Sequence, residues 1–263
     1  MSILIAIPVY NESGTVESVL TEVARYAENV LVVDDGSTDD TPTKLATLPV
    51  DVIRHRRNLG YGRSIRDAFR WAECYRYDWL VTMDCDEQHE PESLPDFLDA
   101  IEKDDADIIS GSRYLDDRRC GSPPPVDRRN INAEITALVN ETLGVGITDA
   151  FCGFKAYRVS GLKKLDLDVS GYAIPLQVWV QMAASGLRVR EVPIRLIYTD
   201  AKRSFGGPLD NPDIRLKHYR DVFEAELSKH PQLIATATVV GGADGTTRSA
   251  HAGATSPRAE REA

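Results

Sequence analysis

The chain has 263 residues, of which 42% are hydrophobic and 27% charged, a balance typical of a globular protein in water. Its formal net charge of −10 argues against nucleic-acid binding, which normally requires an excess of basic residues. No run reaches the roughly 18 apolar residues of a membrane-spanning helix, and no secretory signal is visible at the amino terminus. The four cysteines are scattered, which favours reduced thiols over disulfides or a zinc site.

Short apolar runs alternate with amphipathic segments along the first 110 residues. Strands are expected at 2–8, 30–33, 50–54, 79–83 and 108–110. Helices are expected at about 16–27, from Pro42, from about 60 to 72 and at 94–101, because apolar residues recur there at helical spacing. Pro42 suits a first helical turn. The alternation predicts an α/β fold, with a Rossmann-like, mostly parallel sheet that carries helices on both faces.

The pattern changes after residue 113. A polar, proline-rich loop is expected at 115–126, a helix at 127–143, a loop running into a strand at 149–157, a helix at 174–184, a strand at 189–197, a Gly/Pro/basic loop at 198–212 and a helix at 213–229. Residues 231–263 are rich in Ala, Gly, Thr and Ser and are expected to form a disordered tail. We therefore expect one domain at 1–230, followed by this tail.

Polar side chains follow four of the expected strands. They are Tyr10-Asn11-Glu12, Asp34-Asp35, Asp84 with Asp86 and Gln88, and Ser112-Arg113. Parallel strands end at one edge of a sheet, so these clusters should share one crevice. In extended backbone, Asp84, Asp86 and Gln88 project to the same side. Their oxygen atoms suit Mg²⁺ or Mn²⁺ on a diphosphate, although a lone Asp-x-Asp is by default a solvated turn.

Other features narrow the kind of site. Glu12 and Asp35 suit hydrogen bonds to ribose hydroxyls or base N–H groups, which together with the metal motif describes a nucleoside-diphosphate site. Neither a P-loop nor a G-x-G-x-x-G follows a strand, which disfavours a P-loop NTPase and a Rossmann dehydrogenase. Cys85 should point away from the two aspartates and pack in the core. His55 is expected at the surface or lining the crevice rather than in catalysis.

Several motifs resemble a known family. Ile-Pro-Val-Tyr-Asn-Glu at 7–12, Val-Val-Asp-Asp-Gly-Ser-Thr-Asp at 32–39 and Asp-Cys-Asp-Glu-Gln-His at 84–89 are similar to the family 2 glycosyltransferases of GT-A fold. Four further motifs, at 58–62, 111–114, 152–155 and 191–194, resemble its dolichyl- or polyprenyl-phosphate mannosyl- and glucosyltransferase branch. The likeness covers roughly residues 2–207. It implies a nucleotide-binding half at 1–113 and an acceptor-binding half at 114–230.

The resemblance also implies roles for individual residues. Pro8, Tyr10, Glu12, Asp35 and Asp84 would bind the nucleotide, and Asp84, Asp86 and Gln88 would hold Mg²⁺ or Mn²⁺. The acceptor phosphate would be gripped by Arg113, Arg203 and one of Arg128 and Arg129, of which we take Arg129. The expected catalytic residues are Asp86, Arg113 and Arg203. An arginine fork matches phosphate oxygens bidentately, whereas each arginine taken alone could equally form an ion pair.

The implied reaction is an inverting transfer of mannose or glucose from GDP-mannose or UDP-glucose to polyprenyl phosphate. Residues 170–177 contain no carboxylate where relatives with sugar acceptors carry a base, and an anionic phosphate needs none. The expected location is the cytoplasm, with peripheral contact at the inner face of the membrane, directly or through a partner protein. The alternatives are a soluble sugar, phosphoglycerate or polysaccharide acceptor, or a nucleotide-sugar-binding protein without catalysis.

Overall fold

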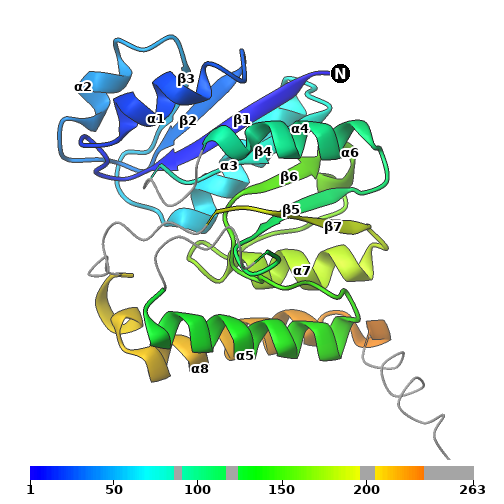
Figure 1. Cartoon of the computed structure of the whole chain (residues 1–263). Coiled ribbons are helices and arrows are strands. Elements are labelled where there is room, and N and C mark those ends of the chain that lie inside the picture. Colours follow the sequence, from blue (N-terminus) through cyan, green and yellow to red (C-terminus); the bar gives the residue numbers. More distant parts are fainter. Residues whose placement is uncertain (86–90, 117–123, 196–204, 234–263) are drawn as a thin grey trace, which may run out of the picture.

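Seven strands form one mixed sheet in the computed structural model, which describes residues 1–85, 91–116, 124–195 and 205–233 (Figure 1). The strands are β1 Ile3–Val9, β2 Val30–Asp34, β3 Asp51–Arg54, β4 Trp79–Thr82, β5 Ile108–Ser112, β6 Lys155–Arg158 and β7 Val189–Pro193. Their order in the sheet is β3-β2-β1-β4-β6-β5-β7. Only β6 runs antiparallel to its neighbours, β4 and β5. The prediction of a mostly parallel α/β sheet is therefore confirmed.

Helices cover both faces of this sheet. They are α1 Val16–Val23, α2 Thr41–Leu45, α3 Tyr61–Cys74, α4 Leu94–Glu102, α5 Val126–Leu143, α6 Val159–Leu162, α7 Ile174–Ala184 and α8 Pro212–Ser228, with 3₁₀ turns η1 Pro91–Ser93 and η3 Gly207–Asp210. Successive strand residues alternate between two buried clusters, as the pleat requires. In β1, Leu4 and Ala6 pack toward α3 and α7, whereas Ile5 and Ile7 pack toward α1 and α4. Figure 1 shows α5 and α8 side by side beyond α7.

Local sequence explains where several helices begin and end. Asn211 caps α8, because its side chain accepts hydrogen bonds from the backbone N–H groups of Asp213 and Ile214. Gly144 ends α5 with a left-handed φ of 66°, a conformation that glycine adopts without strain. Gly60 precedes α3 with a φ of 99°, and a Cβ there would lie 2.3 Å from the carbonyl oxygen of Ser170. The start of α3 is thus packed tightly against the loop before α7.

Two details differ from the sequence expectation. The strand expected at 189–197 ends at Pro193, and α6 was not expected. Within the expected tail, Leu233 packs on the larger core cluster, while 234–263 lie outside the described residues. Among the described helices, none is both long and apolar enough to cross a bilayer.

Candidate active site

The carboxyl ends of β1, β2, β4 and β5 lie at one edge of the sheet. β1 pairs in parallel with β2 and with β4. β5 has the same direction, because both β4 and β5 are antiparallel to β6. The polar clusters that follow these strands therefore line one edge, as the sequence predicted. Asp86, Gln88 and Arg203 were also placed in this site, but they lie outside the described residues.

Asp84 lies at the end of β4, between two core residues. Met83 and Cys85 are buried on the apolar side, which confirms the expected packing role of Cys85. The Tyr61 hydroxyl lies next to the Asp84 carboxylate, on the same side as Gly153. Burial and the nearby Asp84 charge raise the pKa of Tyr61 well above its ordinary value, so the phenol stays a donor. The first residue of α3 thus lies next to the first aspartate of the metal motif.

Gly153 closes the other side of Asp84. A Cβ at Gly153 would lie 2.5 Å from Asp84 Oδ2 and 2.9 Å from the Tyr61 hydroxyl oxygen. These distances are shorter than nonbonded contacts allow, so only glycine fits beside the carboxylate in this arrangement. The loop that enters β6 therefore supplies a wall of the site. In the sequence, Gly153 stands out only as part of the motif at 152–155, which does not indicate this role.

The chemistry of Asp84 fits a hard divalent cation, because carboxylate oxygen is the ligand that Mg²⁺ and Mn²⁺ prefer. Over the described ranges, no group of three or more His, Cys, Asp or Glu side chains is arranged to hold a metal ion. Two of the three ligands predicted from the sequence, Asp86 and Gln88, are outside those ranges. The three-ligand site therefore stays a prediction, of which the structure describes Asp84.

The loops after β1 and β2 are joined into one unit. Asn11, which has a φ of 57°, accepts hydrogen bonds at its side-chain oxygen from the backbone N–H groups of Thr38 and Asp39. Asp39 in turn accepts from the backbone N–H groups of Ser13 and Thr41. Burial would raise the pKa of Asp39, but these hydrogen bonds outweigh it and lower the pKa to about 2. The two loops are therefore tied together where the nucleoside is expected.

The four predicted nucleoside residues differ in exposure. Tyr10 is 44% exposed, whereas Pro8 and Glu12 are half-buried. The Glu12 carboxylate accepts a hydrogen bond of 3.1 Å from the Thr15 hydroxyl. Asp35 is buried, and its carboxylate accepts hydrogen bonds of 2.8 Å from the backbone N–H groups of Leu59 and Gly60. The structure brings all four to the ends of β1 and β2.

Arg113 forms a forked ion pair with Asp149 at the end of β5. The Arg113 Nε lies 2.6 Å from Asp149 Oδ2, and a terminal nitrogen lies 2.9 Å from Oδ1. Asp149 is fully buried, and Asn132 of α5 donates a third hydrogen bond to its Oδ1 at 2.8 Å. Burial would raise the pKa of Asp149, but the Arg113 charge outweighs it and holds this pKa well below its usual range. The predicted phosphate-binding arginine is thus fixed by a carboxylate.

Asp149 was missed by the sequence analysis. The available signal is that it is the one acidic residue between Gly144 and Lys155, in a stretch that is otherwise mostly apolar. Its loop is held by Glu191 of β7, whose carboxylate accepts from the backbone N–H groups of Thr148 and Asp149. β5, β7 and α5 therefore all contribute to the position of Arg113.

The two arginines at the start of α5 have different surroundings. Arg129 is exposed, whereas Arg128 is half-buried, with its guanidinium carbon 4.8 Å from the centre of the Phe205 ring. Phe205 also contacts Tyr172 edge-on, and Tyr172 stacks on Tyr61 at 5.6 Å. An aromatic series thus leads from Asp84 to the start of α5. Arg129 lies three positions before Asn132, so both occupy the same side of the helix.

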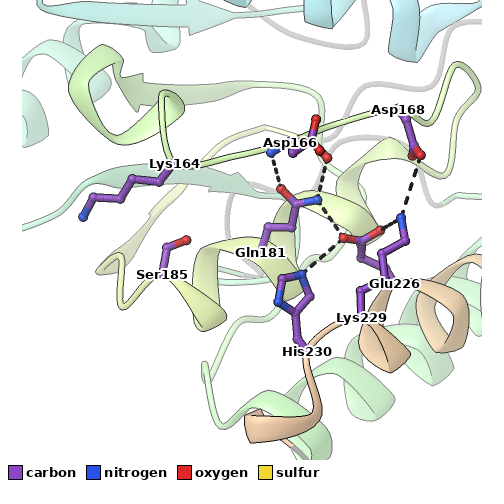
Figure 2. Close-up of a pocket in the computed structure, with 8 residues that line it drawn as sticks. All are labelled: Lys164, Asp166, Asp168, Gln181, Ser185, Glu226, Lys229 and His230. Atoms are coloured by element: carbon purple, nitrogen blue, oxygen red, sulfur yellow. Dashed lines mark hydrogen bonds and ion pairs between the residues drawn. The ribbon is translucent and has the colours of Figure 1, made fainter.

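A buried polar network holds the loop that carries Tyr172. Gln181 of α7 accepts from the backbone N–H of Asp166 at 2.6 Å and donates to the Glu226 carboxylate of α8 at 2.7 Å. Gln177, one turn earlier, accepts from the backbone N–H of Asp168 and donates to the other Glu226 oxygen. Figure 2 shows Glu226 between Gln181 and the side chains of Lys229 and His230. The network borders a cavity of about 280 Å³ that contains none of the predicted site residues.

Glu226 provides a test of this network. Burial would raise the pKa of its carboxyl, but hydrogen bonds from Lys229, Gln177 and Gln181 outweigh it and lower the pKa below the ordinary 4.5. A carboxyl with a lowered folded-state pKa contributes its full stability above the unfolded pKa and loses it as pH falls through the folded pKa. In thermal unfolding experiments, lowering the pH from 7 to 3 should therefore reduce the melting temperature of wild type more than that of Glu226→Gln. The exposed Glu224→Gln variant is the control, and an equal pH response in all three would contradict the assignment.

Comparison with known proteins gives concordant results. The sequence model described as glycosyl transferase family 2 matches residues 4–166. The undecaprenyl-phosphate mannosyltransferase of Micrococcus luteus is 34% identical over 210 residues, which cover 75% of this chain and 84% of that protein. The polyprenol monophosphomannose synthase of Mycolicibacterium smegmatis is 34% identical over 202 residues, covering 73% and 76% respectively.

Solved structures also resemble this chain. Glucosyl-3-phosphoglycerate synthase from Mycobacterium tuberculosis, in complex with Mn²⁺, UDP and glucosyl-3-phosphoglycerate, superposes with a TM-score of 0.64 over 87% of this chain and 79% of that one. The same enzyme with Mg²⁺ and UDP gives a TM-score of 0.66 with equal coverage. Sequence identity in these two comparisons is 18% and 17%, so they demonstrate a shared fold.

Proposed function

The chain belongs to glycosyl transferase family 2 and has the GT-A fold, and from this premise we propose that it transfers mannose or glucose from a nucleoside-diphosphate sugar to polyprenyl phosphate. The observation that carries the proposal is the 34% identity, over about three quarters of the chain, to an undecaprenyl-phosphate mannosyltransferase and a polyprenol monophosphomannose synthase. GDP-mannose and UDP-glucose are the candidate donors. We place the reaction at the cytoplasmic face of a membrane, where the acceptor chain stays in the bilayer.

The donor would bind along the ends of β1, β2 and β4. Pro8, Tyr10, Glu12 and Asp35 would contact the nucleoside, and Asp84 would lie at the diphosphate with Asp86 and Gln88. Bound Mg²⁺ or Mn²⁺ would stabilise the charge that develops on the leaving diphosphate. This chain's own contribution would be to position the Asp84 carboxylate, which lies next to the Tyr61 hydroxyl and Gly153, before the donor arrives.

The acceptor phosphate would bind at the end of β5 and the start of α5, where Arg113 and Arg129 lie, together with Arg203. Among the described contacts, Arg113 uses two of the five N–H groups of its guanidinium on Asp149. The fork that remains can bind two phosphate oxygens in parallel, which is the preferred geometry for arginine. Asp149 therefore aims Arg113 without consuming its capacity for an anion.

An anionic acceptor makes a general base unnecessary. Residues 170–177, which end in the first turn of α7, contain no carboxylate, and Gln177 is fully buried and bonded to Asp168 and Glu226. A phosphate oxygen that is already ionised near neutral pH would attack the anomeric carbon directly and invert its configuration. Arg113 and its neighbours would hold that oxygen in line with the leaving group.

Removal of the metal tests the donor half of the proposal. The purified chain in detergent should form lipid-linked product from radiolabelled GDP-mannose or UDP-glucose and polyprenyl phosphate, with Mg²⁺ or Mn²⁺ present. EDTA or the Asp84→Ala substitution should lower the rate at least about a hundredfold, since each removes charge stabilisation of the leaving group. Exposed Asp105→Ala is the matched control. Metal-dependent hydrolysis of donor without lipid product would contradict the acceptor assignment, and undiminished transfer in EDTA would contradict the metal role.

A further inference from the structure

His55 is held between two carboxylates beside the candidate donor site. Its side chain is only 7% exposed. The ring Nδ1 lies 2.7 Å from Asp35 Oδ1, and Nε2 lies 3.0 Å from Asp67 Oδ2. From the sequence, His55 was expected at the surface or lining the crevice rather than in catalysis. An ionised carboxylate can only accept hydrogen bonds, so each of these two contacts calls for a donor on the ring nitrogen that faces it.

Asp67, the carboxylate that faces His55 Nε2, lies on α3 and has further partners there. Asp67 Oδ2 also accepts from Arg63 Nε at 2.7 Å, and Arg70 contacts Asp67 Oδ1 at 3.4 Å. His55 itself follows β3 and is tied to β2 by a hydrogen bond from its backbone N–H to the Asp34 carbonyl. The ring is therefore fixed from both sides, so the donor that it directs at Asp35 has a defined position.

The contact between His55 and Asp35 determines which acceptor positions of Asp35 remain for a ligand. Among the described residues, Asp35 Oδ1 accepts from His55 and from the Leu59 N–H, and Oδ2 accepts from the Gly60 N–H. Since each carboxylate oxygen offers about two acceptor positions, one position remains, on Oδ2. The same carboxylate holds Gly60, which precedes Tyr61, and the Tyr61 hydroxyl lies next to Asp84. His55, Asp35, the start of α3 and Asp84 thus form one connected set.

We propose that His55 is a positioning residue of the donor site, which fixes the Asp35 carboxylate so that its Oδ2 presents a single acceptor to the donor nucleoside. The proposal rests on the proposed function, because it requires a nucleoside bound at Asp35. It goes further by assigning His55 a role in holding Asp35. A histidine that only stabilises the fold would leave nucleotide affinity unchanged once the variant is folded.

Two substitutions test the contacts of the two ring nitrogens separately. The amide of His55→Asn can still donate near the Nδ1 position toward Asp35, whereas that of His55→Gln reaches the Nε2 position toward Asp67. Calorimetric titration with GDP and UDP should show about a tenfold weaker Kd for His55→Gln, the loss of one hydrogen bond to a charged group, and less than about a threefold change for His55→Asn. Donor KM should follow Kd, while kcat and acceptor KM change less than about threefold. Exposed Arg70→Gln, which contacts the same Asp67, is the control and should bind like wild type.

Each outcome of these measurements either supports or overturns the positioning role of His55. Wild-type-like Kd in a folded His55→Gln variant, or equal losses in the Asn and Gln variants, would overturn the positioning role and leave the proposed function standing. If the wild-type chain binds neither GDP nor UDP, both proposals fail. If His55→Gln does not fold, the NMR resonance of the Nδ1–H proton of His55 is measured in the wild-type chain instead. That resonance should shift when nucleotide occupies Oδ2 of Asp35, and an unchanged resonance would overturn the role.

Discussion

The Gly153→Ala variant is expected to fold and to lose at least about a hundredfold in transfer rate. The added Cβ would lie 2.5 Å from Asp84 Oδ2, so either the carboxylate or the loop before β6 must move. A displacement of about 1 Å near the reacting groups commonly costs about two orders of magnitude in rate. The loss should appear in kcat with donor hydrolysis reduced in parallel, because Asp84 serves the leaving diphosphate rather than the acceptor.

Gly161→Ala is the matched control for this substitution. Its Cβ would meet only Leu187 methyl groups, at 3.5 Å, which is ordinary van der Waals contact. Both variants should give circular dichroism spectra and melting temperatures close to wild type. If Gly153→Ala transfers sugar at a rate within a few-fold of Gly161→Ala, the tight packing of Gly153 on Asp84 has no catalytic importance.

The Asp149→Ala variant should lower the free energy of unfolding by about 3–5 kcal/mol, because it leaves the Arg113 guanidinium, only 14% exposed, without its carboxylate. The Asn132 amide loses its acceptor as well. Transfer should fall with acceptor KM rising, since Arg113 is no longer aimed. Urea unfolding measures the first effect and acceptor titration the second. Asp105→Ala breaks an exposed pair with Arg190 and should cost at most about 1 kcal/mol.

A double substitution separates stability from function at this ion pair. Arg113→Met combined with Asp149→Leu removes both buried charges and should restore much of the lost stability, as replacement of buried pairs by apolar residues often does. Transfer should stay low, because the phosphate grip is gone. A double variant that transfers sugar like wild type would exclude Arg113 from acceptor binding. A double variant as unstable as Asp149→Ala would show that the unpaired Arg113 charge does not explain the lower free energy of unfolding of Asp149→Ala.

The sequence was sufficient for the order of elements and for the edge where the site lies. Apolar runs such as 79–83 identify buried strands, and the residues after them, such as Asp84 and Asp35, must then lie at the carboxyl edge. The direction of β6 could not be predicted. A short run such as Lys155–Arg158 is compatible with either direction, and the choice depends on how the preceding loop crosses the sheet edge.

Contacts between residues that are distant in the chain could also not be predicted from the sequence. His55 with Asp35 and Asp67, and Gln177 with Glu226, are charged or polar residues that local patterns assign to the surface. Their burial follows from contacts between segments 12 to 49 residues apart. The tight fit of Gly153 on Asp84 has the same origin, because a residue's need for glycine depends on what the fold places beside it.

A competition among acceptors for one labelled donor tests whether polyprenyl phosphate is the acceptor. Polyprenyl phosphate, the corresponding unphosphorylated polyprenol and 3-phosphoglycerate would be offered together to the wild-type chain with Mg²⁺, and the labelled products separated. We predict label on polyprenyl phosphate alone, because the unphosphorylated polyprenol offers no anion to Arg113 and phosphoglycerate would need a base to attack through its hydroxyl group. Label on phosphoglycerate or on the unphosphorylated polyprenol, with none on polyprenyl phosphate, would contradict the account.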